Sequence, residues 1–63
     1  MLWYIYNRKT NLFWNNETGW GSLSTAEPYS DTYDDRTKIN LPIDGEWVRA
    51  DSHEARDWKD PDA

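Results

Sequence analysis

The stretch that decides the fold is residues 2–14, with the sequence LWYIYNRKTNLFW. It opens with five bulky residues, and isoleucine and aromatic side chains favour the pleated backbone of a β-strand. Its middle, residues 7–11, is polar and rich in turn formers, and the apolar run resumes at residues 12–14. Two apolar runs joined by a short polar loop predict a β-hairpin in which Tyr6 lies opposite Phe13.

Alternation along the two strands gives this hairpin two apolar faces. The residues of the first face, which we expect to form the core, are Trp3, Ile5, Leu12 and Trp14. The second face carries Tyr4, Tyr6 and Phe13. A domain of 63 residues has little material to cover both faces of a sheet, and an uncovered aromatic patch usually marks an interface. The second face is therefore a candidate either for the core or for a partner-binding surface.

Turn signals divide the rest of the chain. A polar run ends in Gly19, which suits a positive φ, and residues 20–23 follow as a third strand. The Asp-Gly pair at residues 44–45 predicts a turn before a final strand at residues 46–49. Acids precede bases over residues 31–38, as the helix macrodipole favours, so we expect a short helix there. The expected fold is α+β: a small twisted antiparallel sheet of three to four strands, one short helix and a loose C-terminal tail.

Residues 1–50 form a single small domain in this interpretation, and residues 51–63 form an acidic tail. The tail is polar and charged, so we expect it to be disordered or to form a short helix. Trp58 is the one large apolar residue in it and has no local core to join. Either Trp58 folds back onto the sheet or it anchors a partner.

The net charge of −5 is unevenly distributed. Residues 1–24 hold two bases and one acid, a net of +1, and residues 25–63 hold eleven acids and five bases, a net of −6. An acidic domain does not attract phosphate backbones, so direct nucleic-acid binding is disfavoured. A basic protein surface is the partner that fits, and Asp31, Asp34 and Asp35 are the acids that we expect to face it.

The composition offers few residues for catalysis or for metal binding. The chain has no cysteine and one histidine, His53, whereas zinc sites usually need three or four ordered ligands. A carboxylate pair such as residues 34–35 would need a sheltered cleft for acid–base catalysis, and so short a chain has little material for one. We therefore expect no enzymatic activity, no metal and no cofactor.

The apolar opening, residues 1–6, is far too short to span a membrane. It lacks the small-residue cleavage site of a signal peptide, and the bases Arg8 and Lys9 follow it rather than precede it. The absence of cysteine also fits a reducing compartment. These features predict a cytoplasmic protein without membrane contact.

Residues 13–48 resemble small uncharacterised proteins that are common in the genomes of tailed bacteriophages. The similar elements are an aromatic hairpin ending, a Gly-Trp turn, two single residues and a closing run: LFWNNE at 12–17, GW at 19–20, Ala26, Tyr29 and LPIDGEWV at 41–48. The resemblance implies a phage accessory gene product that works in the bacterial cytoplasm. It implies no particular activity.

The predicted function is that of a phage accessory protein that binds a host protein and inhibits or redirects it. Aromatic anchors would give affinity, and acidic residues would steer the protein to a basic surface. The candidate partner-binding residues are Tyr4, Tyr6, Phe13, Asp31, Asp34, Asp35 and Trp58. Two alternatives stay open: an acidic mimic of nucleic acid that blocks a host nucleic-acid-binding or defence enzyme, and a small virion or assembly component. A homodimer also stays open.

Overall fold

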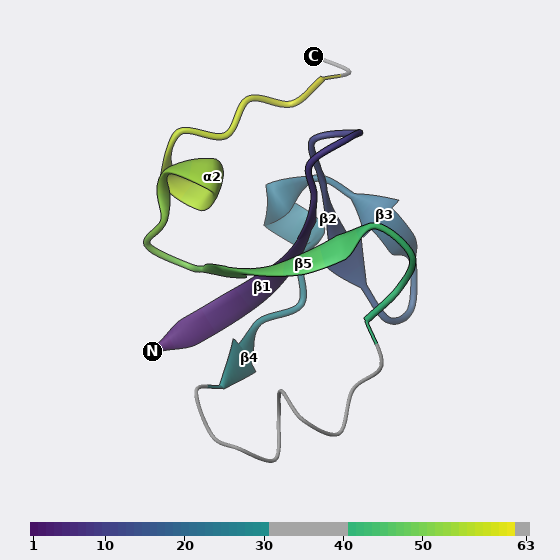
Figure 1. The fold of residues 1–63 in the computed structure, drawn as a ribbon, viewed down its shortest axis with the longest axis horizontal. Coiled ribbons are helices and arrows are strands. Elements are labelled where there is room, and N and C mark those ends of the chain that lie inside the picture. Colours follow the sequence, from purple (N-terminus) through teal and green to yellow (C-terminus); the bar gives the residue numbers. More distant parts are fainter. Residues whose placement is uncertain (31–40, 62–63) are drawn as a thin grey trace.

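The fold is organised around β1, the strand with which three other strands pair (Figure 1). The computed structural model describes residues 1–30 and 41–61. The strands are β1 (Leu2–Asn7), β2 (Leu12–Asn15), β3 (Gly19–Gly21), β4 (Tyr29–Ser30) and β5 (Gly45–Arg49). The helical segments are the 3-10 turn η1 (Leu23–Thr25) and the single-turn helix α2 (His53–Arg56). The helix expected over residues 31–38 lies outside the described residues.

All strand pairs are antiparallel, so the small antiparallel sheet with one short helix is confirmed. β1, β2 and β3 form the predicted meander, with Tyr6 opposite Phe13. Among residues 1–30 and 41–61 the sheet has five strands rather than three to four, because the two-residue β4 joins it. A strand of two residues is too short to leave a periodic pattern in the sequence.

β1 uses its two hydrogen-bonding edges differently. β5 pairs with one edge along residues 3–7. β2 and β4 share the other edge, β2 at residues 6–7 and β4 at residues 2–3. Between these two pairings the Glu27 N–H donates to the Trp14 carbonyl at 3.1 Å. The segment before β4 therefore runs beside β2, in the space between the β1–β2 pairing and the β1–β4 pairing.

Both hairpin loops begin with an asparagine and end four positions later with a left-handed residue. The Asn7 side chain accepts two backbone N–H groups of the first loop, which closes at Asn11 with a φ of 59°. The Asn15 side chain accepts two N–H groups of the second loop, which closes at Gly19 with a φ of 81°. Asparagine and glycine tolerate this region of backbone space best. The positive φ predicted for Gly19 is confirmed.

The turn predicted at residues 44–45 is confirmed, although the left-handed residue is Asp44 (φ 67°) rather than the glycine. Gly45 is needed for space. A Cβ on it would lie 2.9 Å from the Ile5 Cγ2 and 3.0 Å from the Pro42 carbonyl oxygen. The missing side chain allows β5 to approach β1 closely.

Apart from the buried Ile5 and Tyr29, the core lies on one face of the sheet, on the side where Figure 1 shows α2 and the C-terminal segment. Its buried members are Tyr6, Phe13, Val48 and Ala55, and the partly buried residues packed against them are Tyr4, Leu23, Ala26 and Trp58. The loose tail is therefore wrong over residues 51–61, where Ala55 of α2 is 4% exposed and packs on the sheet. Within the described part of the tail, His53–Arg56 form the single turn of α2. A domain this small gains from covering its sheet with every apolar group it has.

Candidate partner-binding surface

Three of the predicted partner-binding residues belong to the core. Phe13 is fully buried, and Tyr6 is 6% exposed. Tyr4 packs edge-on against the Phe13 ring, with 5.8 Å between the ring centroids. Of the two roles left open for this face, the core is the one that the structure shows, because the C-terminal segment covers the face.

Trp58, the fourth aromatic candidate, completes this cover. Its ring lies edge-on to Phe13 at 6.0 Å, and its indole N–H donates to the Asn11 carbonyl at 2.7 Å. The Asn11 side chain donates to the Lys59 carbonyl at 2.9 Å and accepts the Tyr6 hydroxyl at 2.8 Å. Of the two roles left open for Trp58, folding back onto the sheet is the one the structure has. It fastens the tail to the first hairpin loop.

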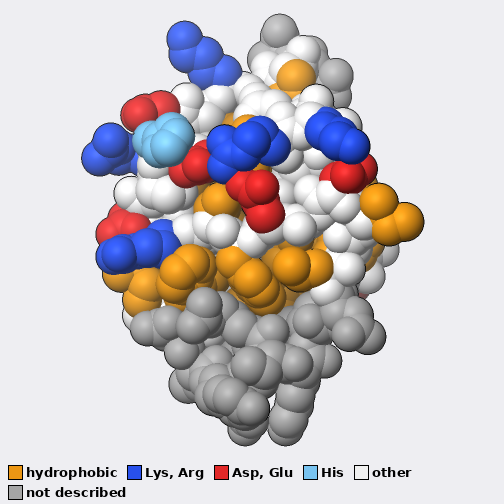
Figure 2. Space-filling view, viewed as in Figure 1, with side chains coloured by type: hydrophobic (Ala, Val, Ile, Leu, Met, Phe, Trp, Pro, Cys, Tyr) orange, Lys and Arg blue, Asp and Glu red, His pale blue; other side chains and the backbone are white. Residues whose placement is uncertain are grey.

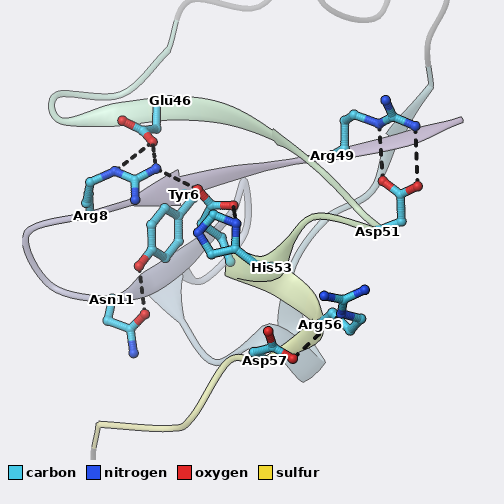
Figure 3. A network of polar contacts seen from close by, with 10 residues as sticks. Tyr6, Arg8, Asn11, Glu46, Arg49, Asp51, His53, Arg56 and Asp57 are labelled. Atoms are coloured by element: carbon cyan, nitrogen blue, oxygen red, sulfur yellow. Dashed lines mark hydrogen bonds and ion pairs between the residues drawn. The ribbon is translucent and has the colours of Figure 1, made fainter.

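Arg8 fastens the same loop to β5 and α2 (Figure 3). Its guanidinium donates to the carboxylates of Glu46 and Glu54, the latter at 2.8 Å, and lies 5.3 Å from the centre of the Tyr6 ring. These hydrogen bonds, the one with Glu54 first, raise the pKa of Arg8. In turn the guanidinium holds the pKa of Glu54 below its ordinary value. One base is thus shared by two carboxylates, and the three groups together keep a net charge of −1.

Other acids of the described C-terminal part also lie beside a base. The ion pairs are Lys9–Asp44 at 3.1 Å, Arg49–Asp51 at 3.1 Å and Arg56–Asp57 at 3.6 Å. Their side chains are largely exposed, so each pair contributes little stability but balances the local field. The acids predicted to face a partner, Asp31, Asp34 and Asp35, lie outside the described residues.

Four of the five tryptophans gather on the face of the sheet opposite the core. They are Trp3, Trp14, Trp20 and Trp47, and we call this set the tryptophan face. Trp14 and Trp20 pair across β2 and β3 with their rings edge-on at 5.1 Å. The ring of Trp47 lies edge-on to Tyr29 at 5.3 Å. All four tryptophans are half-buried and so keep part of their surface accessible.

The first face of the hairpin, expected to form the core, is only partly buried, and the second face has the core role that was left open for it. Of the first face, Ile5 is fully buried, but Trp3 and Trp14 keep partial exposure. Sequence reasoning does not place Trp20 or Trp47 on an accessible surface. The signal that would have found Trp20 is the turn at residues 16–18, since pairing across it places Trp20 opposite Trp14. Figure 2 shows hydrophobic side chains gathered in a band on the molecular surface, beside a region of charged groups.

Polar groups line one end of the tryptophan face. The Trp14 indole N–H donates to the Asn16 side chain at 2.8 Å, and Asn16 donates its side-chain amide and its backbone N–H to the Glu27 carboxylate. The buried Tyr29 hydroxyl has no hydrogen-bond partner of good geometry among the described residues. Burial, and then the negative charge of Glu27, raises the pKa of Tyr29.

Over residues 1–30 and 41–61 the surface has no pocket, and no three His, Cys, Asp or Glu side chains come together as metal ligands. His53 lies beside Glu54, 3.3 Å from its carboxylate. Neither helical segment in this part of the chain has the length and apolar composition needed to cross a membrane. What the described residues offer chemically is an apolar surface with a polar edge.

Comparison of the chain with protein-family models, with curated proteins and with solved structures finds no match. The resemblance to tailed-phage proteins stays a prediction. A function has to be inferred from the geometry of the surface itself.

Proposed function

We propose that this protein binds another protein through the tryptophan face and acts by occluding or redirecting the surface that it covers. The observation that supports this most is the clustering of four half-buried tryptophans on one face of the sheet. Tryptophan offers a large contact area with few rotamers to immobilise, and it is enriched among the residues that dominate binding energy. The core on the opposite face draws on none of these four.

A basic rim on the partner surface fits the charge of the chain. Residues 25–63 carry a net charge of −6, and Glu27 lies at one end of the tryptophan face. Asp31, Asp34 and Asp35, outside the described residues, stay the predicted steering acids. Charges at a rim mainly accelerate encounter, whereas buried aromatic side chains govern dissociation.

The resemblance to tailed-phage proteins supports a host protein as the partner and the bacterial cytoplasm as the place of action. Mimicry of nucleic acid fits the described surface less well. A mimic has to present uncompensated negative charge where a phosphate backbone would lie. Here Arg8, Lys9 and Arg49 lie against carboxylates and cancel much of that charge.

Affinity capture from host lysate with three forms of the protein tests the proposal. Trp20→Ala removes a tryptophan from β3, at one end of the sheet and outside the core cluster. Ile43→Ala is the matched control, since Ile43 is an apolar side chain that is 88% exposed and does not belong to the tryptophan face. We expect one host protein to be retained by the wild type and by Ile43→Ala. Trp20→Ala should bind it about thirtyfold more weakly, the loss typical of an interface hot spot.

Salt dependence separates steering from anchoring in the same assay. Replacing Asp31, Asp34 and Asp35 together with asparagine should slow association and flatten its dependence on salt, because rim charges act on the encounter. Equal capture by wild type and Trp20→Ala would refute the tryptophan face as the binding surface.

A further inference from the structure

We propose that β5 also pairs with the β5 strand of a second copy of this chain, so that two sheets join edge to edge in a symmetric dimer. The inference goes beyond the proposed function, since it needs no host protein. It depends on backbone groups along the outer edge of β5 that have no partner among the described residues. An unpaired strand edge is a ready template for another strand.

One hydrogen bond fixes which backbone groups of β5 face β1. The Ala50 N–H donates to the Leu2 carbonyl at 2.8 Å. In an antiparallel ladder, hydrogen-bonded pairs alternate with pairs that are not bonded, so the even-numbered residues of β5 also bond to β1. The N–H and C=O groups of Gly45, Trp47 and Arg49 therefore point away from β1, to the outer edge of the sheet.

Two of these outer groups are satisfied within the chain. The Gly45 N–H donates to the Pro42 carbonyl at 2.9 Å, and the Arg49 carbonyl accepts the Ser52 N–H at 3.0 Å. The groups left are the Gly45 carbonyl, both groups of Trp47 and the Arg49 N–H. None of them has a hydrogen-bond partner in the part of the chain that the structure describes.

The remaining groups match their own copies in a second chain. In an antiparallel pairing centred on Trp47, the two Trp47 residues exchange two hydrogen bonds, and each Arg49 N–H donates to the Gly45 carbonyl of the other copy. Every unpaired group finds a partner, and the two groups that such a pairing leaves unused are those already bonded within the chain. A second copy is favoured over a foreign strand because the outward groups of the two copies pair with each other and leave none without a partner. Two-fold contacts that use one patch twice are the commonest way in which proteins dimerise.

Side chains along β5 are compatible with this register. Arg49 would lie opposite Gly45, which has no side chain to obstruct it, and Glu46 would lie opposite Val48, so no like charges face each other directly. The two-fold axis keeps equivalent faces on the same side of the joined sheet. The tryptophan faces of the two copies would therefore meet at a Trp47–Trp47 contact.

Sedimentation and amide hydrogen exchange on the purified full chain, from micromolar to millimolar concentration, test the dimer. We expect dimers to form as the concentration rises, and the Trp47 and Arg49 amides to gain protection in parallel. The amides of Glu46 and Val48, which bond to β1, should be protected at every concentration. Added salt should strengthen the dimer, because each copy carries a net charge of −5.

Two variants at one position isolate the backbone contribution. Arg49→Pro removes the outward N–H, whereas Arg49→Ala removes the same exposed side chain and its ion pair with Asp51 but keeps that N–H. The dimer has two such bonds, so the dissociation constant of Arg49→Pro should exceed that of Arg49→Ala by roughly ten- to a hundredfold. Circular dichroism checks that both variants fold. If Arg49→Pro does not fold, amide exchange in the wild type tests the β5 pairing on its own.

Three results would overturn the inference: a monomer at millimolar concentration, a dimer whose Trp47 amide exchanges at the monomer's rate, or equal dissociation of the two Arg49 variants when both fold. None of these results bears on capture of a host protein by the tryptophan face. Failure of the dimer and failure of the proposed function are therefore distinguishable.

Discussion

Trp58→Ala is the substitution that tests most directly whether the C-terminal segment is part of the folded unit. The side chain contributes three interactions: partial burial against the core cluster, an edge-on contact with Phe13, and an indole hydrogen bond to the Asn11 carbonyl. The last two join residues more than forty positions apart in the chain. Their loss should therefore release the tail as well as one ring.

The free energy of unfolding that Trp58→Ala removes follows from these contacts. Deleting a well-buried large aromatic side chain costs about 3–5 kcal/mol. Trp58 is half-buried, so about 2–3 kcal/mol is expected, including roughly 1 kcal/mol for the hydrogen bond. A 63-residue domain has a total stability of only about 3–9 kcal/mol. Trp58→Phe, which keeps an aromatic ring but lacks the N–H, should cost about 1 kcal/mol.

Urea unfolding followed by far-ultraviolet circular dichroism measures these differences. Arg56→Ala is a suitable control on α2, because the Arg56 side chain is 71% exposed and pairs only with the exposed Asp57. Its effect should stay within about 0.5 kcal/mol, as for most surface substitutions. If Trp58→Ala were as mild as Arg56→Ala, the tail would lie outside the cooperative unit and the reasoning would fail.

Two further variants test local features of the fold. Gly19→Ala should cost about 1 kcal/mol or more in the same unfolding assay, because the residue has a φ of +81°. Gly19→Asn should recover most of the lost stability, since asparagine tolerates this backbone conformation. No atom lies within 4 Å of the added Cβ, so an equal cost for both variants would point away from backbone strain. Glu54 has a folded-state pKa below its unfolded value, so its stabilising effect is present above about pH 4.3 and is lost as pH falls through the folded pKa. Glu54→Gln should therefore lose less stability than the wild type between neutral and strongly acidic pH, and identical pH profiles would contradict the Arg8–Glu54 interaction.

The strands and hairpins could be predicted because the information for them is local. Alternation of apolar residues sets the register that places Tyr6 opposite Phe13. Asn7 and Asn15 cap their own loops, and residues that tolerate a left-handed backbone close them. These signals lie within about ten residues of each other, the range over which sequence patterns are informative.

The choice between the two faces of the hairpin could not be made in the same way. Both faces are apolar, so the pattern alone does not say which one is buried. The choice depends on Ala55 and Trp58, which cover the face of Phe13 from the far end of the chain. A polar tail with one tryptophan has the composition of a disordered segment, and only its tertiary contacts overcome that preference. The aromatic candidates lie in the core for the same reason: the residues that look free in the sequence are those that the tail covers.

Because core and tryptophan face alternate along the same strands, their contributions to stability and to binding can be separated. Phe13→Ala empties the centre of the core and should cost about 3–5 kcal/mol, so it should reduce binding only by unfolding the protein. Trp20→Ala removes one edge-on contact with Trp14 and should cost about 1–2 kcal/mol, leaving a folded protein that binds its partner about thirtyfold more weakly. Stability from urea unfolding and affinity for the captured host protein, measured on both variants at a temperature where both are folded, decide the point. Loss of affinity that tracks loss of stability in both would mean that the tryptophans support the fold and that binding, if present, uses another surface.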